Sequence, residues 1–377
     1  MMALIIFILI LSLLVLVHEF GHFFVARKMG VRVEEFGFGI PPRLWGKKIG
    51  ETVYSINALP FGGFVKVAGE DEVELLDKND PGNFANKSWG KRLAILLAGV
   101  VMNILLAITI FYVFFGLNNF RTASLPLLYD YEFAFGRVLR NNTVIFGFEE
   151  DSVAQKAGVG LGEAIWEING QRVFNVHDVR YQIKDQAGQV IRVKLLDTKE
   201  IKPSTREVTI VPTTGPNGAG FLGVALATSV TIDYGDTLSS KLTSGLQHAL
   251  NVLGYSLATF SQLVSTSVAQ KSIEPVSAGV SGPVGIFSIV GVILAYQGVN
   301  IILGLLDFVA ILSLSLAFIN ILPLPALDGG RAIFVLFEGL TRKKVSPKFE
   351  AGVHRWGMIG LLALTFLVTA KDIVNLF

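Results

Sequence analysis

The hydrophobic and polar positions of the 377-residue chain form long apolar runs separated by more polar stretches. A helix needs about 20 mainly apolar residues to cross the hydrocarbon core of a bilayer. Four segments meet that requirement, and they lie within residues 1–28, 93–117, 301–330 and 356–377. The pattern therefore predicts an α-helical multi-span membrane protein with about four transmembrane helices.

The stretch between the second and third runs is much more polar, and it contains a predicted β-rich domain at residues 133–213. A linker at residues 118–132 precedes this domain. The region that follows, residues 214–300, contains a possible amphipathic helix at 238–268. Within the domain, alternating apolar residues predict strands over 144–148, 164–173 and 190–196, and short helices over 153–158 and 177–184.

Between the first two runs, in residues 29–92, two strand-like stretches flank Leu59-Pro60-Phe61-Gly62-Gly63. Proline and glycine at that point predict a hairpin over residues 52–67 with its turn at these five residues. Such a hairpin is either an ordinary surface element or an edge strand that pairs with an extended peptide, with Gly62 and Gly63 among the binding residues.

Basic residues set the expected orientation, because Lys and Arg are enriched on the cytoplasmic side of membrane helices. Arg27 and Lys28 end the first run, Lys91 and Arg92 precede the second, and further basic residues lie between 331 and 355. We therefore expect the N-terminus and the β-rich domain outside the cytoplasm. The hairpin region and a loop at 331–355 are expected inside, and the acidic stretch 70–80 as a solvated loop.

Composition supports the membrane interpretation and restricts the chemistry. Hydrophobic residues make up 51% of the chain and charged residues 16%, which is wrong for an ordinary soluble domain. A net charge of +2 gives no reason to expect nucleic acid as a partner. Since the chain has no cysteine, a metal ion would have to take nitrogen and oxygen ligands.

The first run contains the strongest chemical motif, His18-Glu19-Phe20-Gly21-His22. Residues i and i+4 share one face of a helix, so both imidazoles can reach one metal ion, with Glu19 as general base. With a rise of about 1.5 Å per residue from Ala3, His18 would lie roughly 22 Å deep in a core of ~30 Å. The alternatives are a chance match to the motif or polar residues that pack one helix against another, but ionisable groups in a membrane helix usually have a function.

The third run ends in a break that supplies a further ligand. Two prolines and two glycines interrupt the helix between Asn320 and Gly330, and Asp328 lies inside the break. Broken membrane helices usually mark a binding site, so we expect Asp328 as the third zinc ligand rather than as a simple helix cap. Gly99 and Asn103 in the second run are consistent with close helix packing.

Three other histidines lack partners at ligand spacing. We interpret His177 and His248 as ordinary polar positions and His354 as an interfacial residue.

Together, His18–His22, Gly99-x-x-x-Asn103 and the Asn320–Gly330 motif resemble the bacterial site-2 protease family, of the regulator-of-sigma-E protease type. The resemblance covers nearly the whole chain. It implies a membrane-reentrant hairpin, an inserted PDZ domain and Asn103 and Asn320 near the active site. It also implies a peptide groove near the residues Val144, Ile145, Phe146 and Gly147. Two departures are Val100 after Gly99, where the family often has proline, and a single PDZ domain instead of two.

The resemblance implies a zinc-dependent intramembrane endopeptidase in the bacterial cytoplasmic membrane. Its expected substrates are single-span membrane proteins, such as an anti-sigma factor or signal-peptide remnants, cut after prior trimming. The alternative is a non-enzymatic membrane scaffold with a PDZ domain and a structural metal, and a transporter is a weaker third interpretation.

Overall fold

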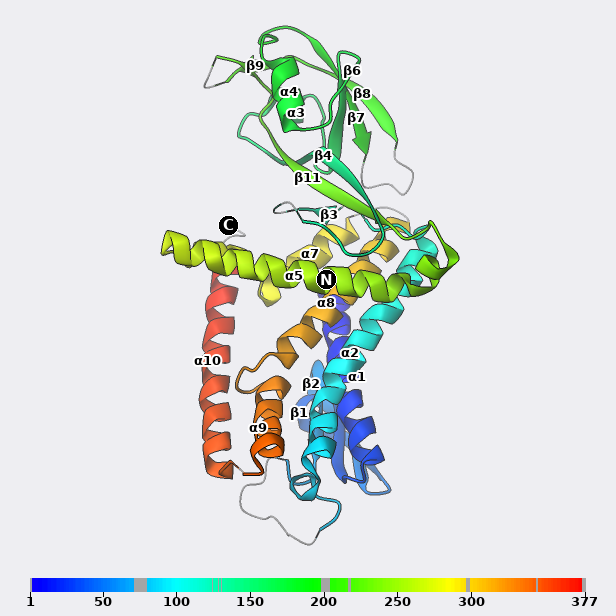
Figure 1. Cartoon of the computed structure of the whole chain (residues 1–377), viewed down its shortest axis with the longest axis vertical. Coiled ribbons are helices and arrows are strands. Elements are labelled where there is room, and N and C mark those ends of the chain that lie inside the picture. Colours follow the sequence, from blue (N-terminus) through cyan, green and yellow to red (C-terminus); the bar gives the residue numbers. More distant parts are fainter. Residues whose placement is uncertain are drawn as a thin grey trace. The chain divides into compact units, whose positions relative to one another are not determined.

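The computed structural model describes residues 2–70, 80–123, 125–127, 129, 131–197, 204–215, 218–295, 299–343 and 345–374. The chain divides into two compact units (Figure 1). Residues 1–112 and 256–377 form the first, which we call the helical unit, and residues 113–255 form the sheet unit.

Among the residues that the structure describes, four helices are long and apolar enough to cross a membrane, namely α1, α2, α8 and α10. The predicted multi-span architecture is therefore confirmed by length and composition. The helices are α1 (Met2–Lys28), α2 (Trp89–Leu117), α3 (Val153–Lys156), α4 (Val176–Ile183), α5 (Leu238–Gln270), α6 (Glu274–Ala278), α7 (Pro283–Leu294), α8 (Val299–Ile321), α9 (Asp328–Thr341) and α10 (Pro347–Val374), with a 3-10 turn at Phe84–Asn86.

The strands of the helical unit form a more elaborate hairpin than the sequence predicts. Strands β1 (Val33–Ile49) and β2 (Thr52–Val67) are joined at Gly50-Glu51. Phe36 is paired with both Tyr54 and Val65, so the first half of β1 lies between the two halves of β2. The chain does reverse direction near the predicted turn at residues 59–63, because residues 53–56 pair with the first half of β1 in parallel and residues 63–67 pair with it antiparallel. The simple hairpin over residues 52–67 is wrong, since the first half of β1 lies between these two halves.

The predicted loop at 331–355 is also wrong, since most of it is helical. Helix α9 begins at Asp328, directly after the break, and buries Ala332 and Val335 three residues apart on one face. Helix α10 then begins at Pro347, well before the predicted span. Most of the acidic stretch predicted as a loop, residues 71–79, lies outside the described residues.

The sheet unit contains one mixed-length antiparallel sheet in the order β3-β11-β4-β5-β7-β8, with β6 paired to β5. Strands β9 and β10 form a separate pair. Their bounds are β3 (Leu125–Pro126), β4 (Arg137–Phe148), β5 (Glu163–Ile168), β6 (Gln171–Arg172), β7 (Ile191–Asp197), β8 (Thr205–Ile210), β9 (Thr213–Thr214), β10 (Gly220–Phe221) and β11 (Val224–Asp233).

Strand β11 lies inside this sheet, although residues 214–300 were expected to be a linker. It pairs with β4 from Val224↔Phe148 to Asp233↔Arg137. The β-rich region therefore extends beyond the predicted end at residue 213. Its core is apolar, and alternate residues of β7, Ile191, Val193 and Leu195, are fully buried in it.

The helix predicted over 238–268 is present as α5, and its first part belongs to the sheet unit. His248 is not a surface position there, because it is 2% exposed. Its Nδ1 lies 3.1 Å from Tyr234 Oη, which also accepts a hydrogen bond from Asn251 Nδ2. Burial lowers the pKa of His248 to about 3, so the imidazole is neutral at physiological pH.

Candidate metal centre

Helix α1 presents both histidines of the motif on its buried side. His18 and His22 are buried, and their rings meet edge to face with centroids 4.9 Å apart. The Nε2 atoms of the two rings lie 3.2 Å apart, so both point into the same small volume. This is the arrangement that an i, i+4 spacing predicts for two ligands of one ion.

Two glycines allow helix α2 to approach α1 at this level. A Cβ on Gly99 would lie 2.6 Å from His18 Nε2 and still closer to His22 Nε2. A Cβ on Gly21 would meet the Ala98 backbone and lie 2.7 Å from Met102 Cγ. Small residues of this kind permit close contact between membrane helices. The space beside the imidazoles therefore exists only because residue 99 has no side chain.

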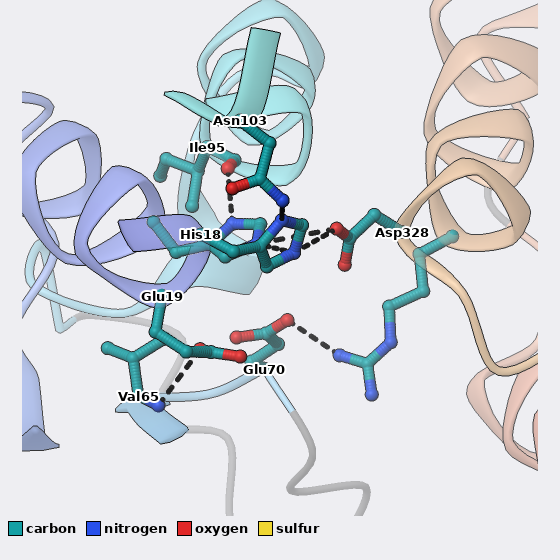
Figure 2. A network of polar contacts seen from close by, with 9 residues as sticks. His18, Glu19, Val65, Glu70, Ile95, Asn103 and Asp328 are labelled. Atoms are coloured by element: carbon teal, nitrogen blue, oxygen red, sulfur yellow. Dashed lines mark hydrogen bonds and ion pairs between the residues drawn. The ribbon is translucent and has the colours of Figure 1, made fainter. Parts of the chain in front are cut away.

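The break after α8 brings Asp328 to the two histidines. Asp328 Oδ2 lies 2.9 Å from His18 Nε2 and 3.4 Å from His22 Nε2. Figure 2 shows the Asp328 carboxylate pointing at His18 from the neighbouring helix. A carboxylate in the first turn of α9 is also favoured by the helix dipole. Gly329 and Gly330 fit beneath the carbonyl groups of the break, where a Cβ on either would collide.

These three side chains could hold a metal ion. Their ligand atoms all lie within 4.8 Å of one another. Two imidazoles and one carboxylate are a donor set that suits zinc and leaves a coordination position open. The separations of the three ligand atoms, 2.9 Å, 3.2 Å and 3.4 Å, fit a common ion.

Further contacts orient the imidazoles from behind. The Nδ1–H of His22 donates to the Ile95 carbonyl oxygen at 2.8 Å, which leaves Nε2 as the ligand atom. His18 Nδ1 lies 3.3 Å from Asn103 Nδ2, and Asn103 Oδ1 is buried with no hydrogen-bond partner in the described part of the chain. With the Asn103 amide turned over, Oδ1 would accept from the His18 Nδ1–H, and both groups would be satisfied.

Glu19 is held by the hairpin. The Val65 N–H donates to Glu19 Oε2 at 3.1 Å, as Figure 2 shows. Val65 lies in the last segment of β2, whose other side is paired with β1 at Phe36. The hairpin therefore brings a strand directly to the glutamate of the motif, as an edge strand beside the metal site requires.

Gly62 and Gly63 of β2 lie against α1. A Cβ on Gly62 would be 3.0 Å from Val15 Cγ1, and a Cβ on Gly63 would be 3.9 Å from Glu19 Cγ. Ser12 Oγ donates to the Pro60 carbonyl at 2.8 Å in the same region. The sequence did not predict these contacts, because nothing in the local pattern says where the hairpin docks.

One ion pair near the site was missed by the sequence reasoning. Glu70 Oε1 lies 2.6 Å from Arg331 Nη1, which joins the residues after β2 to the first turn of α9 (Figure 2). The sequence predicts only a solvated acidic loop at Glu70, because no sequence signal couples positions so far apart.

The remaining predicted residues lie elsewhere. Asn320 is half-buried in the last turn of α8, and within the described residues no hydrogen bond links it to the metal-binding side chains. Val144, Ile145, Phe146 and Gly147 lie in β4, which is paired with β11 and, at Val144, with β5. Val144 and Ile145 are buried in the core, whereas Phe146 is 58% exposed. A peptide groove at these four residues stays a prediction.

Comparison with known proteins agrees with this chemistry. The model of peptidase family M50 matches residues 6–364. A provisionally named zinc metalloprotease of Clostridium acetobutylicum is 32% identical over 367 residues, which cover 97% of this chain and 96% of the relative. Zinc metalloprotease RasP of Shouchella clausii is 27% identical over 449 residues, covering 98% of both chains.

The family match and the names of these relatives favour an enzyme over a membrane scaffold. With four apolar helices, the protein is a multi-pass membrane protein. The chain belongs to peptidase family M50 and is a zinc metalloprotease.

Proposed function

We propose that this zinc metalloprotease cleaves peptide bonds within membrane-spanning segments of other proteins. One observation carries the proposal: His18 and His22 lie on α1, which is apolar enough to span a membrane, and Asp328 reaches them from the break between α8 and α9. A hydrolytic site inside a bilayer has membrane-embedded peptide bonds as its nearest substrates.

His18 Nε2, His22 Nε2 and the Asp328 carboxylate would hold the zinc ion. Zinc bound there supplies a Lewis acid that polarises the scissile carbonyl and activates a water molecule. Glu19 is the general base: its carboxylate takes a proton from the attacking water and delivers it to the leaving nitrogen. The Ile95 carbonyl and Asn103 keep the two imidazoles in the orientation that this role needs.

The edge of β2 is the proposed contact for an unwound substrate. In a substrate helix the carbonyl and N–H groups are hydrogen-bonded to one another. The segment to be cut must therefore unwind first, and its backbone groups need new hydrogen-bond partners. The outward N–H of Val65 is bound to Glu19 Oε2. A substrate strand pairing at this edge would therefore compete for the donor that holds Glu19. We propose Gly62, Gly63, Asn103 and Asn320 as further residues near the bound segment.

The sheet unit is proposed to be a PDZ domain that selects substrates by size. Its antiparallel sheet with two short helices is compatible with that assignment. In the proposed orientation the N-terminus and this domain lie outside the cytoplasm of a bacterium. The expected partners are single-span membrane proteins that another protease has already trimmed, including an anti-sigma factor or signal-peptide remnants.

The replacement Glu19→Gln tests the proposal. An amide cannot accept the proton of water, so the variant should lose cleavage of single-span substrates while its zinc content stays at the wild-type level. Both quantities are measured on purified protein: mass spectrometry detects the cleavage products, and metal analysis gives the zinc content. Near-normal cleavage by this variant would exclude Glu19 as the general base. Cleavage that continues after a chelator has taken the zinc away would exclude a catalytic role for the metal.

A further inference from the structure

The turn that carries Asp328 is strained and needs support from outside. Leu327 N–H donates to the Leu324 carbonyl at 3.3 Å, with Pro325 and Ala326 between them. Ala326 has φ +70°, in the left-handed region. Proline followed by a residue with positive φ is the pattern of a type II turn, whose third position normally belongs to glycine. An alanine there is strained, because its Cβ disfavours the left-handed region.

Helix α10 supplies the support through His354. The turn uses the Leu327 N–H, so the Ala326 N–H needs an acceptor elsewhere. It donates to His354 Nδ1 at 2.8 Å. The His354 ring also packs on Phe334 of α9, with centroids 5.7 Å apart. The imidazole thus contacts both the turn and the helix that begins with Asp328.

Gly357 makes a second contact from the same face of α10. It lies one turn after His354, at the i+3 position. A Cβ on Gly357 would overlap Pro325, and no flexible side chain is available to yield. Two adjacent positions of α10 therefore meet two adjacent residues of the turn, Pro325 and Ala326.

We propose that His354 is a positioning residue for Asp328. By accepting the Ala326 N–H, it holds the turn in the conformation that directs the Asp328 carboxylate at His18 and His22. Asp328 follows Ala326 by only two residues, so a change at the turn rotates the start of α9. Ligand distances in zinc sites vary by only about 0.2 Å, which leaves little tolerance for such a rotation. The inference rests on the proposed role of Asp328 as a zinc ligand.

Zinc affinity of the purified full chain tests this directly, independently of peptidase activity. His354→Leu removes the acceptor, whereas His354→Asn keeps an oxygen close to the position of Nδ1. The Leu variant should lose about 10–100-fold in zinc affinity, the range for partners that orient metal ligands, and the Asn variant should stay close to wild type. The absorption spectrum of the cobalt-substituted protein should change for Leu and not for Asn. Wild-type affinity and spectrum in His354→Leu would overturn the proposal.

A rescue experiment distinguishes an effect of His354 on the turn from a general loss of stability. Glycine adopts positive φ without strain, so Ala326→Gly should recover part of the zinc affinity that His354→Leu loses. Gly357→Ala should improve the intrinsic helix propensity of α10 yet weaken zinc binding, because the new methyl group displaces Pro325. Failure of the rescue, together with normal zinc binding by Gly357→Ala, would also overturn the proposal.

The matched control lies at the other end of α10. Asp372 accepts hydrogen bonds from Gly282 N at 2.7 Å and Gly285 N at 3.0 Å, at the start of α7. Asp372→Ala should loosen α10 and leave zinc affinity unchanged. A loss equal to that of His354→Leu would assign the effect to the whole helix and overturn the role of the hydrogen bond. Asp328→Ala reports on the proposed function instead: full zinc binding by that variant would contradict its ligand role, whatever His354 does.

Discussion

At the scale of single residues, the metal centre depends on a missing side chain as much as on its ligands. Gly99 of α2 faces His18 and His22 at a distance that leaves no room for a methyl group. Alanine is otherwise the better helix former, by roughly 1 kcal/mol. Glycine at position 99 therefore makes α2 less stable than alanine would, and it allows the two imidazoles to lie directly against the helix backbone.

Gly99→Ala should bind zinc at least about tenfold more weakly, because the new Cβ would force the imidazoles away from their shared volume. Peptidase activity should fall with the zinc content. Metal analysis and chelator competition measure the first effect, and substrate cleavage the second. Gly116→Ala on the same helix is the matched control, since a Cβ there meets nothing within 4 Å. Equal zinc affinity in both variants would contradict the packing role of Gly99.

The three side chains that could hold the metal were predictable from sequence, because a helix fixes the relation between His18 and His22 and because a charged residue in a broken membrane helix has few other roles. The residues that orient them could not. The Ile95 carbonyl is a backbone atom with no sequence signal, and the contact of Asn103 with His18 depends on where α1 and α2 cross. The same holds for Ala326 and His354.

At the scale of elements, the junction of β11 and α5 contains a buried polar network within the sheet unit. Tyr234 follows β11, and its hydroxyl contacts His248 and Asn251 of α5. Asn251 also exchanges two hydrogen bonds with the backbone of Phe135, at 3.2 Å and 2.9 Å. Burial raises the pKa of Tyr234 and lowers that of His248, so both are neutral in the folded protein.

This network should make the sheet unit less stable in acid. The folded-state pKa of His248 is about 3 and its ordinary value is 6.5, so the unfolded chain binds more protons between these values. The free energy of unfolding is then fully retained above pH 6.5 and falls by about 1.4 kcal/mol for each pH unit below it. Thermal melting at pH 7 and pH 5 measures the change. His248→Asn, which cannot titrate, should show a smaller loss, and an identical loss in both proteins would exclude His248 as the cause.

Elements were predictable where one pattern dominated. The spans follow from apolar length, and α5 was expected close to its observed bounds. The pairing of the hairpin was not predictable, because the local pattern marks the reversal near Pro60 and Gly62 but not the insertion of β1 between the two halves of β2. Strand β11 was missed because it joins β4 across a long separation in sequence, and pairing of that kind leaves no local signal.

At the scale of the whole molecule, a membrane protease needs a means of excluding most membrane proteins. The proposed edge strand binds backbone groups, which carry little sequence information. His18, His22 and Asp328, which could hold the metal, all belong to the helical unit, so we assign substrate selection rather than chemistry to the sheet unit. We therefore expect it to filter substrates by the size of their external domains and to take no part in the chemistry.

The sheet pairing allows a clean deletion to test this filter. Asn141 and Ser229 are partners in the β4–β11 ladder, so residues 142–228 can be replaced by a two-residue turn such as Asn-Gly. The ladder from Arg137 to Asn141 and from Ser229 to Asp233 would remain as a hairpin. The shortened protein should cleave substrates that still carry their external domains, and the full chain is expected to leave these uncut. Trimmed substrates should be cut by both proteins at similar rates.

Zinc content and thermal melting serve as controls for folding. If the shortened protein is stable and holds zinc but cleaves neither form of substrate, the sheet unit delivers substrates instead of excluding them.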